Sequence, residues 1–468
     1  QDKIDFVEYD LDNGMHVILH EDNSTPIVAV SVMYHVGSKN ENADRTGFAH
    51  FFEHLLFEGT QNIERGEYSE LVEKNGGTLN ANTSQDRTYY YEILPSNQLE
   101  LGLWMESERL LHAKVDQVGI ETQREVVKEE KRQRTDNQPY ASFLPESFKR
   151  LFKNHPYNWV PIGSMEHLDA AQEEDYVNFY RTFYVPSNAV LSIAGDIDVK
   201  ETKALIDKYF ASIPAGEAIN LYRDFENLTA EEFEAKYKVQ KSAFDALNFA
   251  KPSTKDAKKL YKTKRKTEIE VPRPNVEEPK LASTIVDTIY DNIQLPGVFF
   301  SYHAPAQNSK DAYVLNMVND ILSSGASSRM NKEIVENQEL AVQAFSFAFP
   351  LEDPGMAVVA AIASKDAELS VLRDALDAEI TKIQSEMVSD EELQKIKNQY
   401  ENRFYSSNGR IAGIAENLAN NYMYFNDTDL INSELEAYQS ITKEDIMRVA
   451  KEYLTKDARV ELYYLPKK

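Results

Sequence analysis

Two histidines and a glutamate stand close together in the run TGFAHFFEHLLFEGT, as His50, Glu53 and His54. If this run is a helix, the two histidines are four residues apart and their imidazoles project from one face. Two neutral imidazoles on one face can bind zinc, which takes nitrogen ligands in a tetrahedral set. Glu53 lies beside the second histidine, where its carboxylate can reach a water on the metal without being a ligand. The pattern predicts part of a zinc site, although core histidines hydrogen-bonded to carboxylates would show the same letters.

The neighbouring residues indicate how such a motif is held. A strand rich in β-branched residues is expected over 26–35, and Asp44 or Thr46 then offers an N-cap for the motif helix. Gly59 is a plausible C-cap. The other faces of the helix are apolar, so it should be buried; these faces carry Phe48, Phe51, Phe52, Leu55, Leu56 and Phe57.

Composition limits the chemistry that is available. The 468 residues are 42% hydrophobic and 27% charged, as in an ordinary globular protein, and no apolar run reaches the length of a membrane span. The net charge of −26 argues against nucleic acid or an anionic membrane surface as a partner. Cysteine is absent, so disulfides and thiolate zinc are excluded, and a metal must use histidine and carboxylate ligands.

The run TLNANTSQDRTYYYEILP, from Thr78 to Pro95, has a polar first half and an aromatic second half. This pattern predicts an edge strand that leads into a buried strand. Small polar residues leave the backbone accessible, as a site that receives an extended peptide by strand addition requires. A plain surface hairpin would show the same pattern.

The order of elements repeats. The strand LPGVFFSYHAP at 295–305 matches 26–36, a helix at 310–322 matches the motif helix, and the final VELYYLP matches AVLSIAG at 189–195. We therefore predict an α+β fold from an internal duplication, with two homologous domains that each have a mostly antiparallel sheet flanked by helices. The catalytic domain would span 1–215, a partly helical linker or insertion 216–275, and a domain without the histidines 276–468. Lysines between 251 and 266 make the insertion basic, which indicates either a docking surface or a solvated helical face.

At this point the motifs resemble a known family. The order H-x-x-E-H resembles the pitrilysin/insulinase zinc peptidases (inverzincins), and the chain is similar to bacterial two-domain subunits related to mitochondrial processing peptidase beta subunits. That family takes a third ligand from a glutamate downstream, and here 75 residues lie between His54 and Glu130, inside QREVVKEEKR. Glu129 is the rival, but it points about 100° away around the helix. We choose Glu130 for its spacing from Arg124.

The resemblance assigns roles residue by residue. His50, His54 and Glu130 would bind one Zn²⁺ per chain, and Glu53 would act as general base toward a zinc-activated water. The backbone of Asn80, Ala81, Asn82 and Thr83 would pair with the peptide substrate. Gln123 stands where relatives often have a glutamate close to the metal ligands, and its amide could still bind a histidine.

One departure from the family bears on the mechanism. Active members hold the substrate carbonyl with an Arg and a Tyr seven residues apart, whereas Val335 and Val342 stand where we would look for them. The resemblance therefore implies half of a clamshell: a metalloendopeptidase subunit that cuts unfolded peptides in a closed chamber, in a heterodimer whose homologous partner supplies the Arg/Tyr pair. A homodimer stays possible. The alternatives are a non-catalytic scaffold or binding subunit of the same fold, and a peptidase that processes presequences.

The start of the chain suggests a location. It begins at Gln1 and enters strand-like sequence almost at once. This suits a periplasmic or secreted chain whose signal peptide has been removed, although a truncated chain would look the same, and a cytoplasmic location is the alternative.

Overall fold

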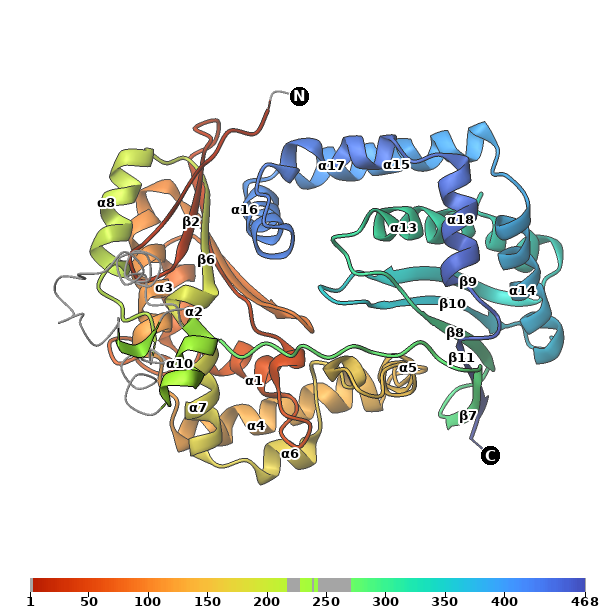
Figure 1. Ribbon diagram of the computed structural model, residues 1–468, viewed down its shortest axis with the longest axis horizontal. Coiled ribbons are helices and arrows are strands. Elements are labelled where there is room, and N and C mark those ends of the chain that lie inside the picture. Colours follow the sequence, from red (N-terminus) through yellow and green to blue (C-terminus); the bar gives the residue numbers. More distant parts are fainter. Residues whose placement is uncertain (1–2, 217–227, 238–239, 243–270, 468) are drawn as a thin grey trace.

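The computed structural model describes residues 3–216, 228–237, 240–242 and 271–467, which form two sheets with helices around them (Figure 1). The predicted α+β fold with two mostly antiparallel sheets is confirmed. No helix in the described part of the chain is both long and apolar enough to cross a membrane.

The first sheet has six strands in the order β1-β2-β6-β3-β5-β4. All neighbours are antiparallel except β2 and β6, which run parallel. Its central strand β3 is buried at seven of eight positions because helices cover both faces, which explains its continuous apolar run. The strands are β1 (Val7–Asp10), β2 (His16–Glu21), β3 (Ile27–Tyr34), β4 (Thr78–Thr83), β5 (Thr88–Pro95) and β6 (Ala189–Gly195). One face packs against helices that include α1 (Phe48–Leu55), α2 (Glu67–Lys74), α3 (Leu99–His112), α4 (Gln117–Lys131) and α8 (Val199–Phe210).

The second sheet repeats this topology with five strands in the order β7-β11-β8-β10-β9. Its β7–β11 pair is parallel like β2–β6, and its other pairs are antiparallel. The strands are β7 (Ile285–Asp291), β8 (Gly297–His303), β9 (Ala341–Phe349), β10 (Met356–Ala363) and β11 (Val460–Pro466). Helices α13 (Lys310–Ser323), α14 (Leu369–Ser385) and α18 (Lys443–Tyr453) cover it. The matching order and direction of five strands is what an internal duplication produces.

The two halves of the chain exchange a helix. Helix α5 (Phe143–Leu151) comes from the first half but packs on β8 and β11 of the second sheet, through Phe148 and Leu151. Conversely, α16 (Ile411–Asn420) packs on β2, β3 and β6 of the first sheet, as Figure 1 shows beside β6. The predicted boundaries at 215/216 and 275/276 stay a proposal about chain segments, because the packed units do not follow the chain strictly.

Two helical stretches of the chain are each divided. The first consists of α6 (Met165–Ala170) and α7 (Glu173–Phe183), because Gln172 is extended and starts a new helix with a capping box. The second consists of α15 (Asp390–Ser407) and α16. The break falls at Asn408-Gly409-Arg410, an Asn-Gly signal of a turn. It lets α16 cross to the first sheet.

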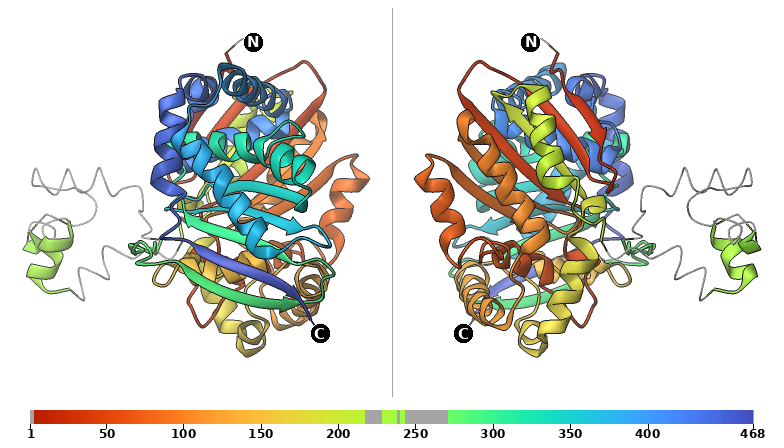
Figure 2. Two further views of the ribbon diagram at one scale, coloured as in Figure 1. Left: turned by 90° about the vertical axis from the view of Figure 1, so that its right-hand side faces the viewer. Right: turned by 90° about the vertical axis from the view of Figure 1, so that its left-hand side faces the viewer.

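The segment 216–275 is described only in part. Helix α10 (Ala230–Tyr237) lies away from both sheets in Figure 2, and the lysine-rich run 251–266 lies outside the described residues. After it, residues 271–280 form neither helix nor strand and cross toward β7; three prolines in this stretch disfavour regular structure. The remaining α-helix of the described chain is α17 (Leu430–Gln439).

Candidate metal centre

Helix α1 starts at a left-handed glycine and is capped from a distance. Gly47 has φ +97°, a conformation that glycine adopts without strain. The buried carboxylate of Glu41 accepts hydrogen bonds from the backbone N–H of Gly47 and of Ala49, each at 2.9 Å, and from the Trp159 indole at 3.0 Å. Burial raises the pKa of the Glu41 carboxyl to about 8, although the hydrogen bonds from these donors lower it in part.

The N-cap expected at Asp44 or Thr46 is therefore wrong. Asp44 is exposed, and the Thr46 hydroxyl lies 2.8 Å from Nδ1 of His167. The C-cap is Leu56 and not Gly59. Glu41 was missed because it stands in a non-helical segment with no local spacing that marks it as a cap.

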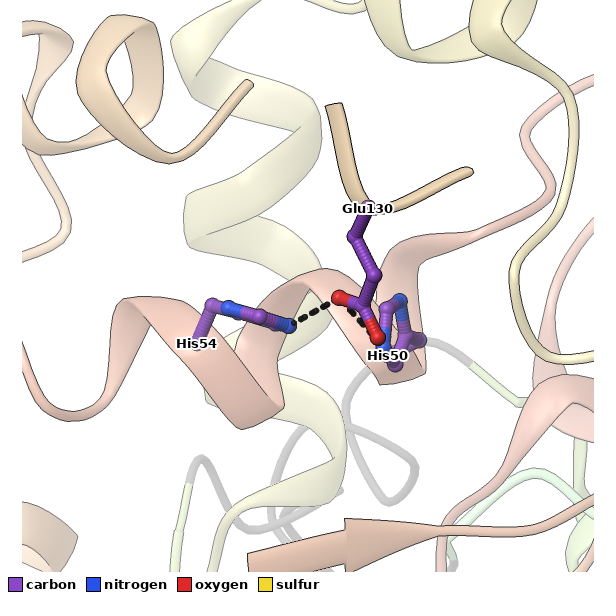
Figure 3. A group of neighbouring side chains, drawn as sticks. All are labelled: His50, His54 and Glu130. Atoms are coloured by element: carbon purple, nitrogen blue, oxygen red, sulfur yellow. Dashed lines mark ion pairs between the residues drawn. The ribbon is translucent and has the colours of Figure 1, made fainter. Parts of the chain in front are cut away.

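Three side chains converge where α1 meets α4 (Figure 3). Nε2 of His54 lies 3.0 Å from Oε2 of Glu130, and Nε2 of His50 lies 3.6 Å from the same oxygen. One donor atom from each residue lies within 4.8 Å of the others, the only such group of three in the part of the chain that the structure describes. The sequence places these residues on two helices far apart, and the fold brings them together.

The donor set fits a zinc ion. A tetrahedral ion with ligand bonds of about 2.05 Å holds its ligand atoms about 3.3 Å apart, between the two separations found here. Oε2 of Glu130 is buried and faces both imidazoles. Burial is the main cause that lowers the pKa of His50 to about 4, and the neighbouring His54 adds to it. The His50 imidazole is therefore in the neutral form that a metal requires. The His54 imidazole likewise holds the pKa of Glu130 below its usual range.

The adjacent Glu129 lies on the other side of α4. Its side chain is 53% exposed, against 14% for Glu130, and it binds Arg132 at 3.0 Å and Gln133 at 2.9 Å. Arg134 bridges to Oε1 of Glu130 at 2.7 Å and leaves Oε2 to face the histidines. Arg134 was missed in the sequence, although its i+4 spacing from Glu130 was a usable signal.

Glu53 lies on the face of α1 next to the donor cluster. Burial raises the pKa of its carboxyl above the usual range, while the neighbouring Thr83 hydroxyl and His54 lower it. A raised pKa makes the carboxylate a stronger base, which suits proton transfer near neutral pH. Thr83 is the last residue of β4, so Glu53 lies between the donor cluster and the end of that strand.

Gln123 does not bind a histidine. Its amide donates to Oε1 of Glu58 at 2.5 Å, and Glu58 also pairs with Arg65. Nδ1 of His50 has no hydrogen-bond partner in the described chain, so the amide does not orient that ring. The expected contact of Gln123 with a histidine is absent from the described residues.

Strand β4 is an edge strand, as predicted. It ends the sheet order and pairs only with β5. Leu79, Ala81 and Thr83 are half-buried toward α1, whereas Asn80 and Asn82 are exposed. The backbone N–H of Ala81 is bonded to the side-chain oxygen of Asn80 at 2.8 Å, so this N–H faces the open edge and not β5. A strand edge that no other described strand pairs with therefore runs beside Glu53.

The described C-terminal half offers no Arg/Tyr pair at the expected place. Val342, at the start of β9, is 55% exposed, and Val335 is partly buried in the second core. Arg329 is used by Glu392, which accepts from it at 2.8 and 3.0 Å.

The fold and the site together define the class: a two-domain α+β protein whose first domain carries a His-His-Glu donor set. Residues 16–158 match the family described as "Insulinase (Peptidase family M16)", and residues 171–400 match "Peptidase M16 inactive domain". The chain belongs to this M16 family of peptidases.

Individual relatives agree with this placement. The "Zinc protease PqqE" of Helicobacter pylori is 27% identical over 457 residues, which cover 97% of this chain and 91% of that protein. The crystal structure of a protease from Helicobacter pylori superposes with a TM-score of 0.83 and 26% identity, covering 99% of this chain and 100% of that one. The periplasmic protease PqqL of Escherichia coli shares the fold, with a TM-score of 0.69 and 19% identity, over 99% of this chain and 48% of that one.

Proposed function

We propose that this chain is a zinc metalloendopeptidase subunit that hydrolyses unfolded peptides. The observation that carries the proposal is the convergence of His50, His54 and Glu130 beside Glu53 and the open edge of β4. His50, His54 and Glu130 would hold one zinc ion, which when bound supplies Lewis-acid activation. Relatives named zinc proteases support the choice of metal.

The residues of the chain supply the remaining steps. The backbone of β4, from Asn80 to Thr83, would pair with an extended peptide and set its register by main-chain hydrogen bonds. Glu53 would remove a proton from the attacking water and return it to the leaving amine. Because β-addition needs an extended backbone, the substrates would be unfolded peptides and not folded proteins.

Full activity would require a second chain. Val335 and Val342 stand where the oxyanion-stabilising pair is expected, and loss of such donors typically costs on the order of 10²–10³ in rate. We infer a heterodimer with a homologous subunit that carries an Arg/Tyr pair, with a homodimer as the less active alternative. A periplasmic or secreted location belongs to the same proposal; PqqL, which shares the fold, is described as periplasmic.

The test is cleavage of a quenched fluorescent unfolded peptide by the chain with stoichiometric zinc, alone and mixed with a homologous subunit that carries an Arg/Tyr pair, beside a Glu53→Gln variant. Cleavage that disappears in the variant while zinc stays bound supports the proposal. Bound zinc without cleavage in any mixture would favour the scaffold or binding-subunit alternative, which the missing Arg/Tyr pair makes the main competitor.

A further inference from the structure

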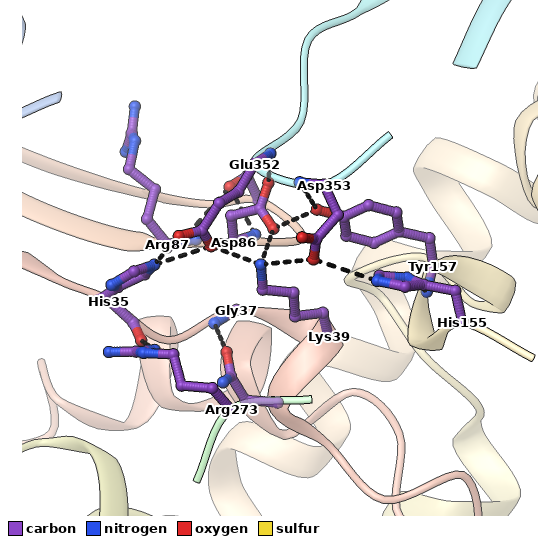
Figure 4. A network of polar contacts seen from close by, with 12 residues as sticks. His35, Gly37, Lys39, Asp86, Arg87, His155, Tyr157, Arg273, Glu352 and Asp353 are labelled. Carbon is purple, nitrogen blue, oxygen red and sulfur yellow. Dashed lines mark hydrogen bonds and ion pairs between the residues drawn. The ribbon is translucent and has the colours of Figure 1, made fainter. Parts of the chain in front are cut away.

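A buried group of charges joins the two halves of the chain, apart from the metal centre (Figure 4). The Lys39 side chain is only 3% exposed, and its Nζ lies 3.0 Å from Asp86, 2.5 Å from Glu352 and 3.1 Å from Asp353. Two histidines extend the group: Nε2 of His35 lies 2.8 Å from Glu352, and Nε2 of His155 lies 3.1 Å from Asp353. Burying so many charges is costly unless each is paired, so this cluster is weak evidence for stability and calls for another explanation.

The cluster joins two particular segments. Asp86 belongs to the turn Ser84–Arg87 that directly follows β4, and it is buried. Glu352 and Asp353 belong to the loop 350–355 between β9 and β10 of the second sheet. The contact includes backbone: the N–H of Glu352 donates to Oδ2 of Asp86 at 2.9 Å.

Tyr157 forms hydrogen bonds with both segments of this contact. Its hydroxyl donates to Oδ1 of Asp86 at 2.6 Å and accepts from the N–H of Asp353 at 3.1 Å. Asp86 thus receives donors from Lys39, from Tyr157 and from the opposite half of the chain. The geometry leaves the turn after β4 little freedom to move without the loop 350–355.

A second attachment holds the same turn from another direction. Arg87 pairs with Glu416 on α16 at 2.7 Å and also donates to the Asn82 side chain, within β4, at 2.7 Å. The C-terminal half therefore contacts the turn Ser84–Arg87 at two places, through the loop 350–355 and through α16. On the other side, β4 has no strand neighbour.

We propose that Lys39, Asp86, Glu352 and Asp353 form a positioning cluster, by which the C-terminal half fixes the peptide-binding edge of β4 relative to Glu53. This rests on the proposed function and gives the half without metal donors a role in substrate binding. The residues touch neither substrate nor metal; they act through the turn Ser84–Arg87. Loosening the cluster leaves the donors His50, His54 and Glu130 in place and lets the edge shift.

The main test compares two matched variants of this chain, Glu352→Gln and Glu392→Gln. Both glutamates lie in the C-terminal half, are partly buried and have a pKa lowered to about 2. Burial alone would raise the pKa of Glu352, but its hydrogen bond with His35 and the nearby positive charge together outweigh this effect. The hydrogen bond with Arg329 lowers the pKa of Glu392. Only Glu352 belongs to the positioning cluster. Amide hydrogen exchange over 78–87 and zinc content are measured for each variant, and KM and kcat for an unfolded peptide are measured with a homologous subunit that carries the Arg/Tyr pair.

We expect exchange over 78–87 to become roughly tenfold faster in Glu352→Gln, with the rate elsewhere and the zinc content unchanged. KM should rise roughly tenfold with a smaller change in kcat, because the edge of β4 would pair with the peptide, whereas the cluster touches none of the reacting atoms. Glu392→Gln should show neither effect. Equal exchange over 78–87 in both variants, or a fall in kcat alone, overturns the positioning role.

Glu416→Gln is the second variant, in case Glu352→Gln fails to fold. It removes the hold of α16 on Arg87 and should accelerate exchange in the same segment; no change there contradicts the proposal. The exchange readout separates this inference from the proposed function. If the wild-type chain cleaves nothing under any condition while exchange over 78–87 still responds, the positioning contact stands and the peptidase assignment fails.

Discussion

Nε2 of His54 and Oε2 of Glu130 lie 3.0 Å apart, although 75 residues separate them in the chain. The first is on α1 and the second on α4, and the two helices pack against each other at this point. An isolated ion pair of this kind contributes little to stability, but a second imidazole, 3.6 Å from the same oxygen, makes the pair a donor set.

Removing one member of this set should abolish metal binding. Glu130→Gln should lower zinc content from one ion per chain to near zero, because a neutral amide is a poor ligand beside two imidazoles. The measurement is zinc per chain by elemental mass spectrometry after dialysis. Glu129→Gln is the matched control and should keep its zinc, since Glu129 is exposed and pairs with Arg132. Zinc loss in the control with retention in Glu130→Gln would move the ligand to the neighbouring residue.

The Glu53→Gln change should separate binding from chemistry. Glu53 lies beside the donors without belonging to the converging group, so zinc content should stay at the wild-type level. Peptide cleavage should fall by about 10²–10⁴, the usual contribution of a general base. The readout is the initial rate with the peptide in excess, together with zinc content. Unchanged cleavage would assign the proton transfer to another group.

Glu41 should stabilise the start of the motif helix. Glu41→Ala leaves buried N–H donors of Gly47, Ala49 and Trp159 without their acceptor, and we expect a loss of about 1–3 kcal/mol in the free energy of unfolding. Urea unfolding, followed by circular dichroism, gives the value. Asp44→Ala, in the same loop but exposed, should change stability by less than about 0.5 kcal/mol. A larger effect at Asp44 would restore it as the cap.

The cluster around Lys39 should make stability depend on acid pH. The pKa of Glu352 is lowered from 4.5 to about 2, so its charge stabilises the folded state fully above pH 4.5, and this stabilisation is lost as pH falls toward 2. Relative to Glu352→Gln, the wild-type chain should be more stable by on the order of 2 kcal/mol at pH 6. The difference should shrink below pH 4.5. A difference that does not vary between pH 6 and pH 3 would contradict the ion pairing.

Much of the first domain follows from local patterns. The i, i+4 spacing of His50 and His54 predicts a shared helix face, and the polar run at 78–83 predicts an edge strand; the structure has both. The repeated order of strands predicts the two similar sheets, because periodicity and turn residues are visible within each segment.

Other features depend on contacts that no local pattern encodes. Glu41 reaches the helix start from a loop, and Gln123 binds Glu58 and not a histidine, because tertiary packing decides which partner is near. The exchange of α5 and α16 between the sheets is equally invisible, since each helix has only an ordinary apolar face in the sequence. The cluster of Lys39, Asp86 and Glu352 joins residues from three separate segments, and no spacing in the sequence marks them as partners.

We propose that this chain supplies a zinc site and that another chain completes the active site. The most direct test is the rate of cleavage of an unfolded peptide by the zinc-loaded chain, alone and mixed with a homologous subunit that carries the Arg/Tyr pair. We expect cleavage to be at least about 10²-fold faster in the mixture, and to be lost when Glu53→Gln replaces the wild-type chain. The same high rate from the isolated chain, or a mixture indifferent to Glu53→Gln, would contradict it.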